Sequence, residues 1–100
     1  MIAWAAGLYE GEGTATRCNG RLRLSVRMTN EETVRRFAAA LRCGTVYGPY
    51  KYSSRDRYVR KPVCVWLADC EDAWSVAALL RPWLRALRRA QLERVFHADV

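Results

Sequence analysis

Two carboxylates, Glu10 and Glu12, lie one residue apart in the glycine-rich stretch GLYEGEGT, residues 7–14. The apolar residues 2–6 before them predict a helix that ends on these two acids. A helix C-terminus carries partial negative charge, so each anion there is disfavoured by a few tenths to about 1 kcal/mol. We therefore expect the two carboxylates to bind a positively charged group, which would offset this unfavourable free energy.

The helix predicted over residues 2–11 has small residues at every fourth position, Ala3, Gly7 and Gly11. Residues at this spacing share one helix face, and helices pack closest over small side chains. A glycine inside a helix costs about 1 kcal/mol relative to alanine, which a close helix contact at Gly7 would justify. Gly11 and Gly13 can also serve as the helix C-cap and the following turn; the two interpretations are compatible.

Residues 21–29 alternate strictly between apolar and polar side chains, which is typical of a strand. A further strand, Thr14–Asn19, precedes it, and Asn19-Gly20 is a hairpin signal. The polar face carries three arginines and no acid, whereas an ordinary solvated face mixes both signs. We therefore expect it to face nucleic acid. The apolar positions are Leu22, Leu24, Val26 and Met28, and the polar positions are Arg21, Arg23, Ser25, Arg27 and Thr29.

The charge balance supports the same partner. Seventeen basic residues, fifteen of them arginine, face ten acidic ones, for a net charge of +7. Such a charge favours nucleic acid or an anionic membrane, and the planar arginine fork suits phosphate and guanine. No apolar run approaches the roughly 20 residues of a membrane span, and no signal peptide is seen, so no membrane partner is expected. Scattered cysteines without a CxxC pair, and one histidine, argue against zinc.

The rest of the chain predicts a second helix, two more strands and a helical C-terminal part. Thr29 or Asn30 can cap the second helix, and Gly44 ends it. The strands are predicted at Thr45–Tyr52 and Val63–Ala68, with a polar loop at Ser53–Tyr58 between them. A third helix, Glu71–Leu80, is interrupted at Pro82, and a basic helix follows to about His97. Its apolar side is expected in the core: Leu80, Trp83, Leu84, Leu87, Leu92 and Val95.

This order predicts one α+β domain over residues 1–100, with a four-stranded antiparallel sheet covered by helices on one face. At this point the chain resembles the single-motif LAGLIDADG homing endonucleases. The motif corresponds to residues 5–13, and the segments LRLSVRMTNEET and LRPWLRALRRAQL match family positions in character and order. Ala5 stands where the family usually has leucine, and both motif acids are glutamate here. The resemblance covers essentially the whole chain and implies the family's αββαββα(α) fold.

The resemblance implies a site-specific, double-strand DNA endonuclease encoded by an intron or other mobile element. It would act as a homodimer on a long pseudo-palindromic site. Glu12 would be the catalytic acid and would hold Mg²⁺, or alternatively Mn²⁺, with the carbonyl of Gly11. Glu10, the first acid of the motif, would have a structural or capping role, with direct metal binding as the alternative. The two-fold interface would comprise Ala3, Gly7, Leu8 and Gly11.

Two further positions receive a catalytic role from the resemblance. Asn30 would orient water near the phosphate, although a role as helix cap is equally consistent with its position. Relatives carry a lysine near the start of the final helix, where this chain has Leu87, with Arg85 and Arg88 beside it. Arg88 is the catalytic candidate there; an arginine can stabilise charge but cannot readily shuttle a proton.

The exposed sheet face would enter the major groove, which admits a two-stranded ribbon. From the first hairpin the expected DNA contacts are Arg17, Arg21, Arg23, Ser25 and Arg27. From the second they are Tyr50, Lys51, Arg55, Arg57 and Arg60.

Two other functions remain open. One is a non-catalytic module of the same fold, either an intron RNA maturase or a DNA-binding regulator; the other is a structural dimer whose basic face is incidental. The expected location is cytoplasmic or otherwise intracellular and DNA-associated, with an organelle as the alternative.

Overall fold

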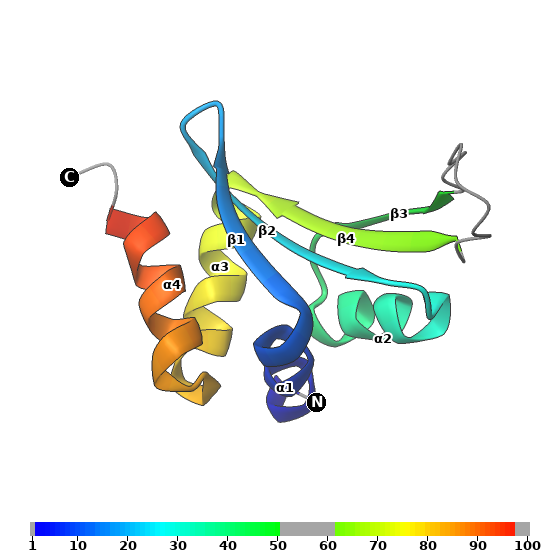
Figure 1. Cartoon of the computed structure of the whole chain (residues 1–100), viewed down its shortest axis with the longest axis horizontal. Helices are drawn as coiled ribbons and strands as arrows, with labels where there is room; N and C mark the ends of the chain where they lie inside the picture. Colours follow the sequence, from blue (N-terminus) through cyan, green and yellow to red (C-terminus); the bar gives the residue numbers. More distant parts are fainter. Residues whose placement is uncertain (1, 51–61, 98–100) are drawn as a thin grey trace, which may run out of the picture.

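The computed structural model describes residues 2–50 and 62–97, in the order of four helices and four strands shown in Figure 1. The predicted order of elements is confirmed. The elements are α1 (Ile2–Glu12), β1 (Gly13–Cys18), β2 (Arg21–Met28), α2 (Glu31–Leu41), β3 (Thr45–Tyr50), β4 (Val63–Asp69), α3 (Cys70–Leu80), a short 3-10 turn η1 (Arg81–Trp83) and α4 (Ala86–His97).

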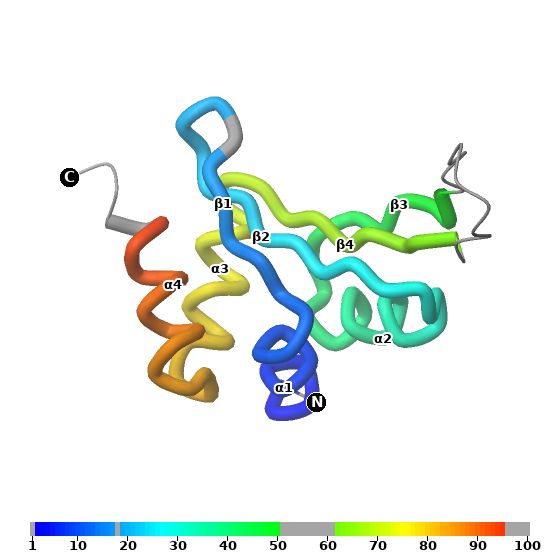
Figure 2. The backbone as a smooth tube through the Cα atoms, viewed as in Figure 1, coloured from blue at the N-terminus to red at the C-terminus, as the bar shows by residue number. Residues whose placement is uncertain are grey.

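The four strands form one antiparallel sheet in the order β1-β2-β4-β3. Strand β2 is central, with Gly13 opposite Val26 on one side and Arg23 opposite Asp69 on the other. The helices lie below the sheet in the view of Figure 1, and the other face is left open. The backbone trace in Figure 2 shows β1 rising from α1 to the hairpin turn on the side of α3 and α4, and β2 running back from that turn toward α2. This confirms the predicted α+β class, with helices on one face of the sheet.

The β1–β2 hairpin closes through the predicted Asn19-Gly20 turn. Both residues have positive φ, 53° and 77°, as a two-residue turn matching the strand twist requires. The turn therefore fixes the register that sends Leu22, Leu24 and Val26 toward the helices, where all three are buried.

The core beneath β4 centres on Trp66, which is fully buried. Its ring meets that of Phe37 edge-on, with 4.9 Å between centroids, and its Nε1 donates to the Cys43 carbonyl at 3.0 Å. Gly44 is required at this contact, because a Cβ there would lie 2.3 Å from Trp66 Nε1. The prediction that Gly44 ends α2 is wrong. The helix ends at Leu41, and Arg42 takes the left-handed conformation that follows it (φ 56°).

The predicted core residues Trp83 and Leu87 are a second correction, since they are 59% and 89% exposed. Pro82 lies in the 3-10 turn, and the extended Leu84 (ψ 147°) interrupts the helix before α4. The restart resets the helix phase so that Leu92 points inward. Leu87, five residues earlier, then lies about 140° around the helix from Leu92.

Strand β3 ends at Tyr50. The predicted strand end at Tyr52, the polar loop Ser53–Tyr58 and the candidates Lys51, Arg55, Arg57 and Arg60 lie outside the described residues. Among the described residues, no helix is both long enough and apolar enough to cross a membrane.

Candidate nucleic-acid interface and metal site

The open face of the sheet carries the polar side of β2. Thr14 and Thr16 of β1 lie opposite Ser25 and Arg23 in the register, so their side chains share this face. Together with the end of α1 they surround a hollow of 380 Å³. Its lining residues are Glu12, Thr14, Thr16, Arg23, Ser25, Arg27 and Leu67. The hollow therefore joins one carboxylate to two arginines and several hydroxyl groups.

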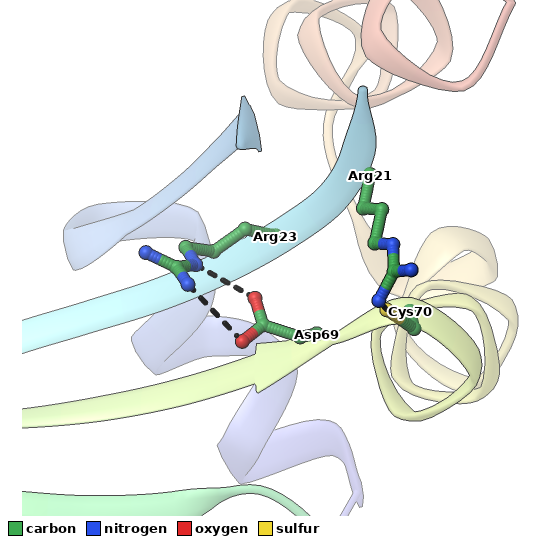
Figure 3. A network of polar contacts seen from close by, with 4 residues as sticks. All are labelled: Arg21, Arg23, Asp69 and Cys70. Atoms are coloured by element: carbon green, nitrogen blue, oxygen red, sulfur yellow. Dashed lines mark hydrogen bonds and ion pairs between the residues drawn. The ribbon is translucent and has the colours of Figure 1, made fainter. Parts of the chain in front are cut away.

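Arg23 is held across the sheet by Asp69 of β4. Its Nε and Nη2 donate to the two carboxylate oxygens at 2.6 and 3.2 Å (Figure 3). Exposed ion pairs contribute about 0–1 kcal/mol to stability, so the main effect is to orient the guanidinium. Asp69 is not among the residues predicted for the site. The signal was available, because alternation in β4 puts Leu67 and Asp69 on the face opposite to the buried Trp66 and Ala68.

Arg21 lies near the hairpin end of the same face. Its Nη1 is 3.7 Å from the Cys70 sulfur at the start of α3 (Figure 3). Cys70 has φ 56°, where the chain turns sharply from β4 into α3. Arg21 and Asp69 also line a second, larger hollow of 620 Å³ with Trp74. Glu71 and Asp72 line that hollow too, so charges of both signs meet near the hairpin, whereas the hollow at Glu12 is mainly basic.

Arg17 does not lie on the open face of the sheet with the other predicted DNA contacts. It lies opposite the buried Leu22 in the register, so its side chain leaves the strand on the helix side of the sheet. Its Nε donates to the Val95 carbonyl of α4 at 2.9 Å, and its Nη1 to the Gly20 carbonyl at 2.9 Å. The physical reason is strand alternation: odd positions of β1 and odd positions of β2 face opposite ways in this register.

Glu12 ends α1 and is exposed at the edge of the hollow. Its neighbours Thr14, Thr16 and Ser25 offer further oxygen atoms. Within residues 2–50 and 62–97 no group of three histidine, cysteine or acidic side chains could hold a metal. The single carboxylate of Glu12 with the neighbouring hydroxyl groups fits Mg²⁺, because this ion keeps several waters and is usually bound through one or two carboxylates plus substrate phosphates.

Glu10, by contrast, faces the start of α4. Its Oε2 accepts from the Arg85 backbone N–H at 3.1 Å. Arg88 donates from Nε and Nη2 to the Glu10 carbonyl at 3.2 and 3.0 Å, and from Nη1 to the Gly13 carbonyl at 2.7 Å. We refer to Glu10, Gly13, Arg85 and Arg88 as the α1–α4 clasp. The cation expected at the end of α1 is therefore Arg88, at the carbonyl groups where a helix dipole favours positive charge.

Tyr9 packs beneath the clasp and leaves room only for glycine at position 13. A Cβ on Gly13 would lie 2.3 Å from Tyr9 Cδ2. The Tyr9 side chain is 1% exposed, and its hydroxyl has no hydrogen-bond partner within the described part of the chain. Burial raises the pKa of Tyr9 to about 12, with the positive charge of Arg88 opposing the shift. The end of α1 is thus tightly packed directly beside the open hollow.

The remaining predicted residues have clear positions. Asn30 caps α2, since its side chain accepts from the Thr33 backbone N–H at 3.0 Å. Tyr50 is half-exposed at the end of β3. Ala3, Gly7 and Gly11 are all exposed along α1, and Leu8 is partly buried. A Cβ on Gly7 or Gly11 would meet nothing within 4 Å, so this ridge is open on the surface of the single chain.

Comparisons with known proteins yield structural relatives only. No protein-family model and no curated protein sequence matches the chain. Similar solved structures include the homing endonuclease I-CvuI in complex with the I-CreI target in the presence of Mg, where the DNA is not cleaved. The TM-score is 0.66 and the identity 21%, over 94% of this chain and 62% of that one.

I-CvuI in complex with its own target in the presence of Ca gives a TM-score of 0.65 and 18% identity, over 98% of this chain and 69% of that one. The archaeal intron-encoded homing endonuclease I-Vdi141I, complexed with DNA, gives 0.65 and 14%, over 91% and 62%. The chain therefore spans less than two thirds of the length of two of these chains. From its order of elements, its sheet and these neighbours, the chain has the fold of the LAGLIDADG homing endonucleases.

Proposed function

We propose that this protein is a site-specific, double-strand DNA endonuclease that acts as a homodimer with Mg²⁺. The observation that carries the proposal is the position of Glu12, which lies at the edge of a hollow lined by Arg23 and Arg27. A carboxylate in such a position is unfavourable for binding a polyanion unless a cation accompanies it. Metal-assisted phosphodiester hydrolysis accounts for both the acid and its basic surroundings.

DNA would lie along the open face of the sheet. Arg21, Arg23, Ser25 and Arg27 follow each other on one side of β2, spaced by roughly 7 Å as alternate strand residues are. This spacing allows successive contacts along a groove, where arginine can bind guanine through two parallel hydrogen bonds. Tyr50, Lys51, Arg55, Arg57 and Arg60 are proposed to extend the contacts from the second hairpin.

The second copy would pack on the ridge of α1. Ala3, Gly7, Leu8 and Gly11 are proposed to form the two-fold interface, because an exposed row of small residues permits close helix approach. This arrangement brings Glu12 of each copy to the centre of the dimer. Each copy can then serve one strand of the duplex, and the target is expected to be pseudo-palindromic.

Glu12 and the Gly11 carbonyl are proposed to hold the metal, with Mn²⁺ as the alternative to Mg²⁺. Such an ion, when bound, polarises the phosphate and lowers the pKa of its water. Asn30 is proposed to orient water, although its side-chain oxygen already accepts from Thr33. Glu12 contributes by placing one negative charge in a site that is otherwise basic.

The test is cleavage of a library of DNA duplexes in Mg²⁺, read by sequencing the cut ends. We expect double-strand cuts at one long site. Glu12→Gln should reduce the cleavage rate by at least about 100-fold, the size seen when one key electrostatic group is lost. Glu32→Gln is the matched control, since it removes an exposed helical acid away from the hollow. The absence of cleavage by the wild-type protein, or full cleavage by Glu12→Gln, would contradict the proposal.

One observation favours a non-catalytic DNA- or RNA-binding module instead. Leu87 is 89% exposed at the position where the family resemblance implies a lysine. An apolar side chain there cannot take part in proton transfer. Nucleic-acid binding that is unchanged by Glu12→Ala, without any metal-dependent nicking, would select this second function; competition between duplex DNA and intron RNA would then identify the ligand.

A further inference from the structure

We propose that Arg88 is a positioning residue for Glu12, acting through the backbone on both sides of it. This inference depends on the proposed function in one respect, namely that Glu12 binds the metal. The guanidinium donates to the carbonyl of Glu10 at 3.2 and 3.0 Å and to the carbonyl of Gly13 at 2.7 Å. These two carbonyl groups bracket Gly11 and Glu12, the two residues proposed to contact the metal.

The bracketed segment lies at the junction of a helix and a strand. Helix α1 ends at Glu12 and β1 begins at Gly13, so the chain passes from helix to strand without a loop. Gly11 and Gly13 lie on either side of Glu12, and glycine is the most flexible residue of the backbone. The hydrogen bonds from Arg88 therefore add to the pairing of Gly13 with Val26 and to the packing of Tyr9 in fixing a segment that is rich in glycine.

Arg88 is itself held in place by its own helix and by Glu10. Its Nη1 also donates to Gln91 Oε1 at 2.7 Å, one turn along α4. Glu10 in return accepts from the Arg85 backbone N–H at 3.1 Å, which fixes the start of α4 against the end of α1. The two helix ends therefore stabilise each other, with a positive side chain at the C-terminus of α1 and a negative one at the N-terminus of α4.

These bonds also change the role assigned to Arg88. A guanidinium has five N–H donors, and the bonds to Glu10, Gly13 and Gln91 use four of them. A group engaged in this way is not available to bind a reacting phosphate. Lysine cannot replace it, because a single ammonium lacks the planar fork that reaches both carbonyl groups.

The test measures metal binding without any cleavage reaction. Tb³⁺ luminescence is titrated on the full chain, and the Glu12→Gln titration is subtracted to isolate binding at that side chain. Arg88→Lys should raise the Tb³⁺ dissociation constant about 10-fold, the usual effect of losing a group that orients a metal ligand. Arg94→Lys, a like substitution at an exposed position of the same helix, should leave it unchanged.

Gln91→Ala provides a second variant in case Arg88→Lys folds poorly, since it removes only the brace on Arg88. It should raise the dissociation constant in the same direction, with a melting temperature close to wild type. Unchanged Tb³⁺ affinity in folded Arg88→Lys or in Gln91→Ala would overturn the inference. Identical titrations of wild type and Glu12→Gln would overturn it as well. Failure of the wild type to cut DNA, with the predicted Tb³⁺ shifts present, would refute the nuclease proposal alone.

Discussion

Only Gly11 separates Glu10 from Glu12 in the chain, yet the two acids lie in different surroundings. Glu10 belongs to the α1–α4 clasp, where its carboxylate and carbonyl oxygen both accept hydrogen bonds from the start of α4. Glu12 lies in the hollow on the open face, among arginines and hydroxyl groups. One acid is therefore engaged in contacts within the fold, whereas the other lines an open hollow.

The difference shows how one helix end can serve two purposes. Arg88 offsets the partial negative charge of the α1 carbonyl groups on the packed side. The exposed side of the same helix end can then present a carboxylate without destabilising the helix greatly. Changes in the clasp should therefore alter stability first, whereas changes in the hollow should alter ligand binding first.

Gly13→Ala should give the largest effect on stability. Its Cβ would lie 2.3 Å from the buried Tyr9 ring, which cannot move without disturbing the clasp. Inserting a methyl group into a packed site of this kind costs typically about 1–3 kcal/mol. Urea unfolding followed by circular dichroism should show that loss in the free energy of unfolding.

Gly7→Ala is the control for the same chemical change in an open position. A Cβ there meets nothing within 4 Å, and alanine is favoured over glycine inside a helix by about 1 kcal/mol. The stability of the monomer should rise or stay level. Equal destabilisation by both variants would remove the distinction between the two sides of α1.

Arg27→Ala should weaken DNA binding with little effect on stability, because its side chain lines the hollow and is exposed. If it contacts a phosphate, the slope of log K against log salt should fall by about 1. Fluorescence anisotropy with a duplex at several salt concentrations measures that slope. Arg35→Ala is the control, because Arg35 lies on the helix side and pairs with Glu31, and it should leave the slope unchanged. If both variants changed the slope equally, the open face of the sheet would not be the DNA-binding surface.

Tyr9→Phe should give the smallest effect, visible only in alkali. The pKa of Tyr9 is raised from 10.0 to about 12 in the folded chain, so the folded state favours the protonated phenol. This contribution to stability is complete below pH 10 and is lost as the pH rises through 12. Tyr9→Phe should resist unfolding between these values better than wild type. If the free energy of unfolding fell equally with pH in both proteins, the pKa of Tyr9 would not be raised in the folded state.

The elements with strong local signals were predictable from the sequence. Strict alternation over Arg21–Met28 predicts both faces of β2, and Asn19-Gly20 predicts the turn before it. Asn30 was predictable as a cap because the acids Glu31 and Glu32 follow it. These signals depend only on neighbouring residues, so no knowledge of the tertiary arrangement is needed.

The errors arise where distant segments decide the outcome. Arg17 was grouped with the basic face, but the Val95 carbonyl, 78 residues away, accepts from it on the other side. Leu87 was assigned to the core, but the interruption at Leu84 sets the phase of α4. The family resemblance grouped Arg88 with Glu12 in one site, but no local signal indicated that its guanidinium binds the carbonyl groups of Glu10 and Gly13.

The strand order β1-β2-β4-β3 has a consequence for synthesis of the chain. The inner pair joins residues 21–28 to residues 63–69, so a growing chain cannot complete its sheet until β4 has left the ribosome. Until then β2 presents an unpaired edge that could associate with other strands. The arginines at positions 21, 23 and 27 would repel a second copy of that edge, so the residues proposed to hold DNA could also keep the nascent protein from aggregating.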